Sequence, residues 1–166
     1  MRRLSTLKTI VDILFVFAMI AVIFGLPLIL MLIIIPEQVP ITFSEGRSPS
    51  GIDFIGFLFF IYVGYLFFVY ALYLFRKTLE LFRKRIFFDN RVIKNLDQTG
   101  KAILIGVVIM IIPAILLRLT ESPIELEVNI GLNDTLITAG LGLFFIVLSD
   151  VFAMAKKHKE DSDLTV

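Results

Sequence analysis

Four long apolar runs, separated by polar segments, dominate the pattern of the 166-residue chain. Residues 13–36 and 54–75 carry no charge, residues 102–117 form a shorter charge-free run, and residues 135–155 contain one charge, Asp150. A helix that crosses a bilayer needs about 20 apolar residues. The pattern predicts a single all-α membrane domain over residues 1–166, a four-transmembrane-helix bundle. Its expected parts are spans at about 10–35, 53–75, 102–119 and 135–155, and a short polar tail at 156–166.

The first and third runs each require a further argument. A cleaved signal peptide has an apolar core of roughly 7–15 residues, followed by a small-residue cleavage site. The first run is longer and ends in Ile33-Ile34-Ile35-Pro36, which indicates an uncleaved anchor. The third run is short for a span, but Lys101 and Arg118 at its ends can extend their charges outward along apolar stems.

Basic residues gather on one side of the predicted spans. Of the 16 Lys and Arg residues, only Arg47 and Arg118 lie in the two loops on the other side. Those two loops instead carry acids, namely Glu37, Glu45, Glu121, Glu125, Glu127 and Asp134. Segments rich in Lys and Arg stay in the cytoplasm. We therefore expect a multi-pass protein with both termini and the loop 76–101 in the cytoplasm.

The composition supports a membrane protein and narrows the functional classes. The chain is 58% hydrophobic and 19% charged, with mean hydropathy +0.93 and net charge +1. Soluble domains are nearer half apolar and a quarter charged, and a small body cannot bury so much apolar surface in water. The large basic excess of nucleic-acid-binding proteins is missing. The chain has no cysteine, which excludes a disulfide scaffold and a thiolate metal site.

The loop between the second and third spans is expected to be mostly helical. The segment Arg76–Arg85 continues the second span, and Phe87–Asn90 interrupts the helix. Asp89 is a candidate N-cap for the helix that runs into the third span. Phe88 and Ile93 are placed to form a hydrophobic staple across that cap.

The two outer loops show a different period. Residues 123–130 alternate apolar and polar positions, and Val39, Ile41 and Phe43 alternate in the first outer loop. Period two is typical of a strand with one apolar face. A single strand cannot satisfy its own backbone, whereas two strands on one side of a membrane can pair. We therefore expect small paired β-strands, Val39–Phe43 with Ile124–Ile130, on the outer side.

Several stretches resemble a known family of bacterial membrane proteins. They are Val11–Leu14 after a basic amino terminus, Tyr70–Lys77, Ile86-Phe87 before a short helix, Leu141–Phe152, and the tail Lys159–Val166. Through these stretches the chain is similar, over nearly its whole length, to the family catalogued as domain of unknown function 2975. The most specific parts are Leu148–Phe152 and the acidic tail that ends in Leu164-Thr165-Val166.

The resemblance implies a four-span protein of the bacterial inner membrane. Relatives are often encoded beside a small helix-turn-helix regulator. The family brings no established activity, so it implies no catalytic residue. One position departs from the usual pattern, because Asp150 stands where similar proteins commonly have glutamate, and this exchange keeps the charge.

Asp150 is the leading candidate for a functional residue, because an ionisable group within a span is costly. At about 100° per residue, it shares one face of the fourth span with mostly small or polar residues: Thr135, Thr138, Ala139, Gly142, Ile146, Ser149 and Ala153. We expect this face to pack inside the bundle, with Asp150 buried. An intramembrane ion pair with Arg76, Lys77 or Lys101 would neutralise the carboxylate. A proton relay or ligand site and a snorkelling side chain are the alternatives.

Few other residues suggest chemistry. Asp12 lies near the start of the first span, one turn from Lys8, and the helix dipole favours an acid there, so we expect an interfacial, solvated acid. The single histidine, His158, lies in the polar tail, so no metal site is expected. The sequence shows no nucleotide-binding loop, paired catalytic carboxylates or Ser-His-Asp set. We therefore expect neither an enzyme nor a cofactor.

The lipid bilayer is the expected partner of the four spans. Three functions remain open for the protein. The first is a non-enzymatic regulatory or interaction role, in which the cytoplasmic side binds a protein such as the regulator that the resemblance implies. Direct nucleic-acid binding is not expected. The second is a small-solute transporter or channel, which would require a homo-oligomer because polar residues within the spans are scarce. The third is immunity to a membrane-active peptide.

Overall fold

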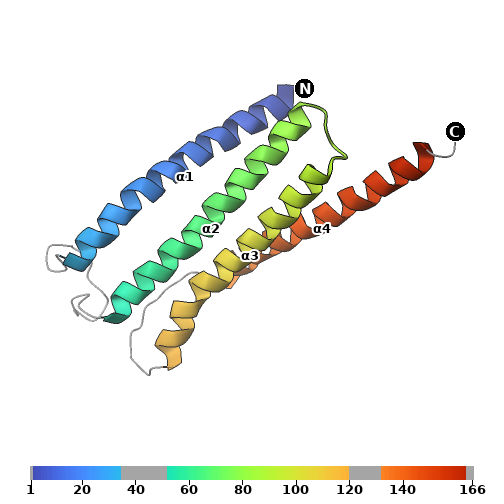
Figure 1. The fold of residues 1–166 in the computed structure, drawn as a ribbon. Helices are drawn as coiled ribbons and strands as arrows, with labels where there is room; N and C mark the ends of the chain where they lie inside the picture. Colours follow the sequence, from blue (N-terminus) through green and yellow to red (C-terminus); the bar gives the residue numbers. More distant parts are fainter. Residues whose placement is uncertain (1, 35–51, 120–131, 164–166) are drawn as a thin grey trace.

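The computed structural model describes residues 2–34, 52–119 and 132–163, which form four helices (Figure 1). The helices are α1 (Arg2–Ile34), α2 (Ile52–Arg83), α3 (Asn90–Leu119) and α4 (Leu132–Asp163). Each contains a stretch long and apolar enough to cross a membrane: Leu4–Met31, Leu58–Arg83, Asn90–Pro113 and Asp134–Ser162. The prediction of an all-α protein with four membrane helices is confirmed.

The helices extend beyond the predicted spans. α2 continues to Arg83 and α3 begins at Asn90, close to the ends expected for the loop helices. α4 continues through most of the predicted tail, and Lys156 and Glu160 pair across one turn of this extension. The predicted spans end where charged residues begin, but Lys and Glu are good helix formers. A helix therefore does not have to end where the apolar run ends.

The predicted paired strands are not supported. Their segments, Val39–Phe43 and Ile124–Ile130, lie outside the described residues. Within residues 2–34, 52–119 and 132–163, the chain forms helices and one turn between α2 and α3, and no strand.

The four helices pack in a row, each beside the next one in the chain (Figure 1). Close backbone contacts join α1 to α2, α2 to α3, and α3 to α4. α4 lies behind α3 in this view, and its carboxyl end leans away from the other helices. Because the helices alternate in direction, the α2–α3 turn and both ends of the chain lie at the same end of the bundle.

The core of the bundle surrounds α3. The buried apolar cluster comprises Ala71 on α2, four residues of α3 and Phe145 on α4; the α3 members are Val92, Leu96, Ala102 and Ile103. On α1, by contrast, the buried apolar side chain is Val11, and most other described apolar residues of that helix are exposed. Exposed apolar helix faces are expected of a protein whose solvent is lipid.

Glycines set the spacing of α2, α3 and α4. A Cβ atom at Gly100 of α3 would lie 2.5 Å from the backbone oxygen of Gly142 on α4. A Cβ atom at Gly64 of α2 would lie 3.1 Å from the backbone oxygen of Gly106 on α3. Small residues allow membrane helices to approach backbone to backbone. The two glycine contacts therefore fix where α3 meets each of its neighbours.

Candidate functional site

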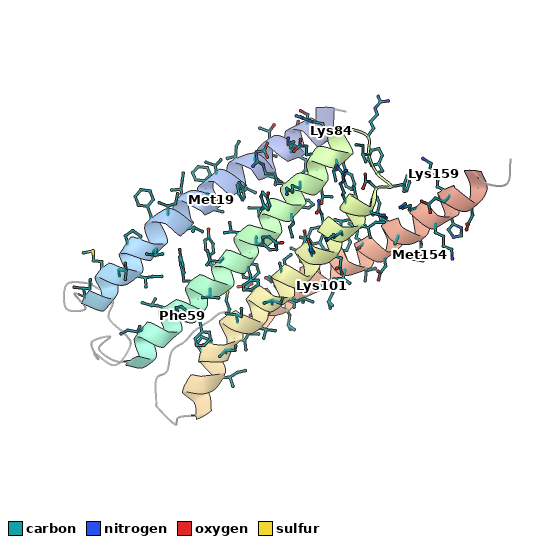
Figure 2. The ribbon with its side chains drawn as sticks, viewed as in Figure 1. Met19, Phe59, Lys84, Lys101, Met154 and Lys159 are labelled. Atoms are coloured by element: carbon teal, nitrogen blue, oxygen red, sulfur yellow. The ribbon has the colours of Figure 1, made fainter. Side chains whose placement is uncertain are left out.

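Most of the described charges lie at the end of the bundle that holds both termini. We call this region the charged end and define it as residues 4–12, 76–101 and 150–163. Figure 2 shows Lys84 and Lys159 at its outermost part, and Met19 and Phe59 farther along the apolar helices. The candidate residues predicted from the sequence all belong to this region.

An ion pair joins α1 to α2 within the charged end. The Arg76 Nε atom donates a hydrogen bond to Asp12 Oδ1 over 2.5 Å. The Arg76 guanidinium also lies 5.3 Å from the centre of the Phe15 ring, which in turn contacts the ring of Tyr73. The side chains of Asp12 and Arg76 are 33% and 41% exposed to solvent. A pair this accessible contributes up to about 1 kcal/mol.

The candidate bases have partners other than Asp150. Arg76 pairs with Asp12, and Lys101 Nζ donates to Asp97 Oδ2 over 2.7 Å on its own helix. Lys77 Nζ lies 4.7 Å from the centre of the Tyr73 ring. Asp150 itself is exposed, and its carboxylate makes no ion pair with any residue that the structure describes. The predicted burial of Asp150 is therefore wrong, and the predicted pair does not form within the described chain.

The register between α2 and α4 is one reason for this difference. Phe75 packs against Phe145, and Phe82 stacks on Phe152, with ring centroids 5.3 and 5.6 Å apart. Because α2 and α4 are parallel, these two pairs place Asp150 level with Glu80. That height is one turn beyond Arg76, towards the outer part of the charged end. Arg76 therefore lies about one helical turn from Asp150 along the bundle, which keeps these two residues apart.

The direction of the packed face of α4 is the second reason. The residues that pack inward follow a seven-residue repeat through Gly142, Phe145, Ser149 and Phe152. At about 100° per residue, the centre of these four positions lies roughly 120° around the helix from Asp150. The packed face includes Phe145 and Phe152, whereas the expected face was centred on the small and polar residues. Asp150 shares that expected face but not the face that packs.

Side-chain hydrogen bonds connect α4 to α3 in the same region. The buried Ser149 hydroxyl donates to the backbone oxygen of Ile93 over 2.8 Å. Farther out, Lys156 Nζ donates to Asn90 Oδ1 over 2.7 Å. Ser149 and Phe152 both belong to the stretch 148–152 that carries the family resemblance. Their contacts hold this part of α4 against the ends of α2 and α3 that lie at the charged end.

The end of α2 is a well-defined helix stop. Ile86 N–H donates to the Leu81 oxygen and Arg85 N–H to the Phe82 oxygen, both over 3.0 Å. This is the Schellman arrangement, in which the residue after the helix adopts a left-handed conformation that usually requires glycine. Here that residue is Arg85, with φ of 61°.

The start of α3 is equally well defined. The carboxylate of Asp89 accepts a hydrogen bond from the backbone N–H of Arg91 over 2.8 Å. This contact confirms the predicted N-cap and satisfies one of the free donors at the helix start. The chain between the two helix ends is therefore short, and both of its ends are anchored by hydrogen bonds.

The short turn between these caps presents apolar side chains at the outermost part of the charged end. Phe87 contacts Phe82 of α2, with ring centroids 5.5 Å apart. The side chains of Ile86, Phe87 and Phe88 nevertheless remain 39%, 37% and 41% exposed. We call Ile86–Phe88 the apolar turn. The sequence predicts a helix break at Phe87–Asn90, but three apolar residues between two basic segments could also have indicated an exposed surface.

The comparison with family models decides the classification of the chain. The model described as "Protein of unknown function (DUF2975)" matches residues 2–166. The chain belongs to the DUF2975 family. The match includes all four helices of this DUF2975 protein together with the apolar turn. Its four long apolar helices make this protein a multi-pass membrane protein. Comparisons with curated proteins and with solved structures gave no match.

Proposed function

We propose that this protein is a non-enzymatic interaction protein of the bacterial inner membrane, which binds a protein partner at its charged end. The carrying observation is the apolar turn, whose three side chains remain exposed between two capped helix ends. The excess of Lys and Arg at this end supports a cytoplasmic orientation. The regulator implied by the family resemblance is one candidate partner.

The height of the apolar turn favours a protein over lipid as its contact. Counted outward from the apolar middle of the bundle, Asp12 and Arg76 are the first charges of α1 and α2. We take the level of this ion pair as the edge of the hydrocarbon layer. From Arg76 to Arg83, α2 rises about 10 Å. The polar headgroup layer occupies only about 5–7 Å on each side of the hydrocarbon. The apolar turn follows Arg83 and therefore lies beyond the headgroups, where exposed aromatic side chains contact water unless a partner covers them.

Transport and immunity are less well supported. The glycine contacts bring α2, α3 and α4 together backbone to backbone, and large side chains fill the described core. A solute pathway would then have to lie between copies of the chain. Immunity to a membrane-active peptide would require a surface towards the outside, whereas the exposed apolar turn belongs to the charged end.

Site-specific photo-crosslinking in intact cells tests the proposal. A photoreactive residue at Phe87 should form an adduct with a protein partner. The matched control is the same residue at Phe144, which is exposed on the apolar part of α4 and should react with lipid. Adducts with lipid alone at both positions would contradict the proposed function.

Labelling of single cysteines tests the orientation, because the chain has no native cysteine. A cysteine at Ser162 should be protected from an impermeant reagent in intact cells and react after permeabilisation. A cysteine at Ser48 should react without permeabilisation. The reverse pattern would place the charged end outside the cell and contradict a cytoplasmic partner.

A further inference from the structure

The charges around the apolar turn indicate which kind of protein segment would bind there. This inference rests on the proposed function and adds the chemistry of the partner. Acids of the charged end are engaged within the chain: Asp12 with Arg76, Glu80 with Lys84, Asp97 with Lys101, Glu160 with Lys156, and Asp89 with the start of α3. The charged end also contains Asp150, Asp161 and Asp163, but its 12 Lys and Arg residues outnumber its eight Asp and Glu residues.

The bases beside the turn are exposed to solvent. Arg91 keeps 79% of its side-chain exposure and reaches Asp89 only at 4.0 Å. Lys159 Nζ lies 5.7 Å from the centre of the Phe88 ring, and Arg83 is exposed in the last turn of α2. Figure 2 shows that Lys84 and Lys159 lie on either side of the turn. The exposed rings are therefore surrounded by positive charge contributed by α2, α3 and α4.

We infer that the partner contacts the apolar turn with an acidic segment that also carries an apolar anchor residue. Interfaces commonly combine an apolar centre with a polar rim, and complementary charge at the rim selects the partner. The apolar turn supplies the centre, and Arg83, Arg91 and Lys159 supply the rim. A second copy of this chain fits less well, because most acids of its charged end already bind within their own chain.

Crosslinking from position 87 in the full-length protein tests the charge requirement. The double variant Arg83→Glu with Lys159→Glu should lower the yield of the protein adduct about tenfold, because like charges at an interface repel. The matched control is Lys157→Glu. Residue 157 is two positions from Lys159, so at about 100° per residue it points away from the turn, and its adduct yield should stay within about twofold of the unaltered chain.

The composition of the crosslinked peptide provides the second measurement. Mass spectrometry of the adduct should identify a partner peptide that contains a cluster of Asp and Glu beside an apolar residue. A neutral or basic peptide, or an unchanged yield in the double variant, would overturn the acidic segment while leaving a protein adduct in place. If the chain with its native charges gives no protein adduct, or an adduct with phospholipid only, the proposed function itself is overturned. The two failures are therefore distinguishable.

Discussion

α1 and α4 lie at opposite ends of the row of helices, but different contacts hold them. α4 meets α3 at the Gly100–Gly142 backbone contact and adds the hydrogen bond of Ser149. α1 meets α2 mainly through longer polar side chains. Tyr62 and Tyr65 of α2 donate hydroxyl hydrogen bonds to backbone oxygens of α1, over 3.1 and 3.3 Å. The Asp12–Arg76 pair completes this set near the charged end.

The difference follows from the physics of helix association in lipid. Apolar side chains gain little by leaving lipid for another apolar surface, so helices associate through close packing and interhelical hydrogen bonds. α4 uses close packing, which depends on the absence of a side chain at two positions. α1 uses polar groups, each of which contributes modestly. We therefore expect α2, α3 and α4 to form the stable part of the bundle, and α1 to be the helix that separates most easily.

The largest effect is expected at the glycine contact. Gly100→Ala places a Cβ atom 2.5 Å from the Gly142 oxygen, so α3 and α4 must move apart, at a cost of about 2–3 kcal/mol. Gly140→Ala is the matched control, because a Cβ atom there meets nothing within 4 Å, and alanine favours helix by up to about 1 kcal/mol. Thermal unfolding in detergent measures both changes. Similar destabilisation by the two variants would contradict the role of the close contact.

The next effect is expected at the ion pair that attaches α1. Asp12→Asn and Arg76→Gln should each lower the free energy of unfolding by up to about 1 kcal/mol, since the pair is partly solvated. The double variant should lose less than the sum of the two single losses, because both remove the same interaction. Unfolding in detergent at low and high salt gives the comparison. Additive losses would show that the pair does not couple α1 to α2.

The tyrosine hydrogen bonds should contribute less than the ion pair. Tyr62→Phe and Tyr65→Phe each remove one hydroxyl, and interhelical hydrogen bonds in membranes average about 0.6 kcal/mol. Tyr70→Phe is the control on the same helix, because Tyr70 is exposed and should change the stability very little. Equal changes for all three variants would mean that the hydroxyl contacts do not hold α1.

The local features of this fold are predictable from the sequence, whereas the contacts between helices are not. Apolar runs predict the four helices, and the spacing around Asp89 predicts the cap of α3. The pairing of Asp12 with Arg76 depends on the register between two helices, because 64 positions separate the two residues. A helical wheel of α4 has the same difficulty, because it cannot show that packing follows a heptad through Phe145 and Phe152.

The smallest effect is expected at Asp150, and it provides the sharpest comparison with Asp12. Both positions carry an acid in the half of a membrane helix nearer the charged end, but Asp12 has a base and Asp150 is exposed. Asp150→Asn should therefore change the stability of the isolated chain by no more than about 0.5 kcal/mol, less than Asp12→Asn. The Ser149–Ile93 hydrogen bond places Asp150 level with Val92, between Arg91, which reaches Asp89, and Lys94, so Lys94→Gln should be equally mild. Asp150→Asn could instead lower the stability as much as Asp12→Asn does. If that loss disappears when Lys94 is already replaced, Asp150 and Lys94 form a pair across α3 and α4. The same loss without dependence on Lys94 would point to a base outside the described residues.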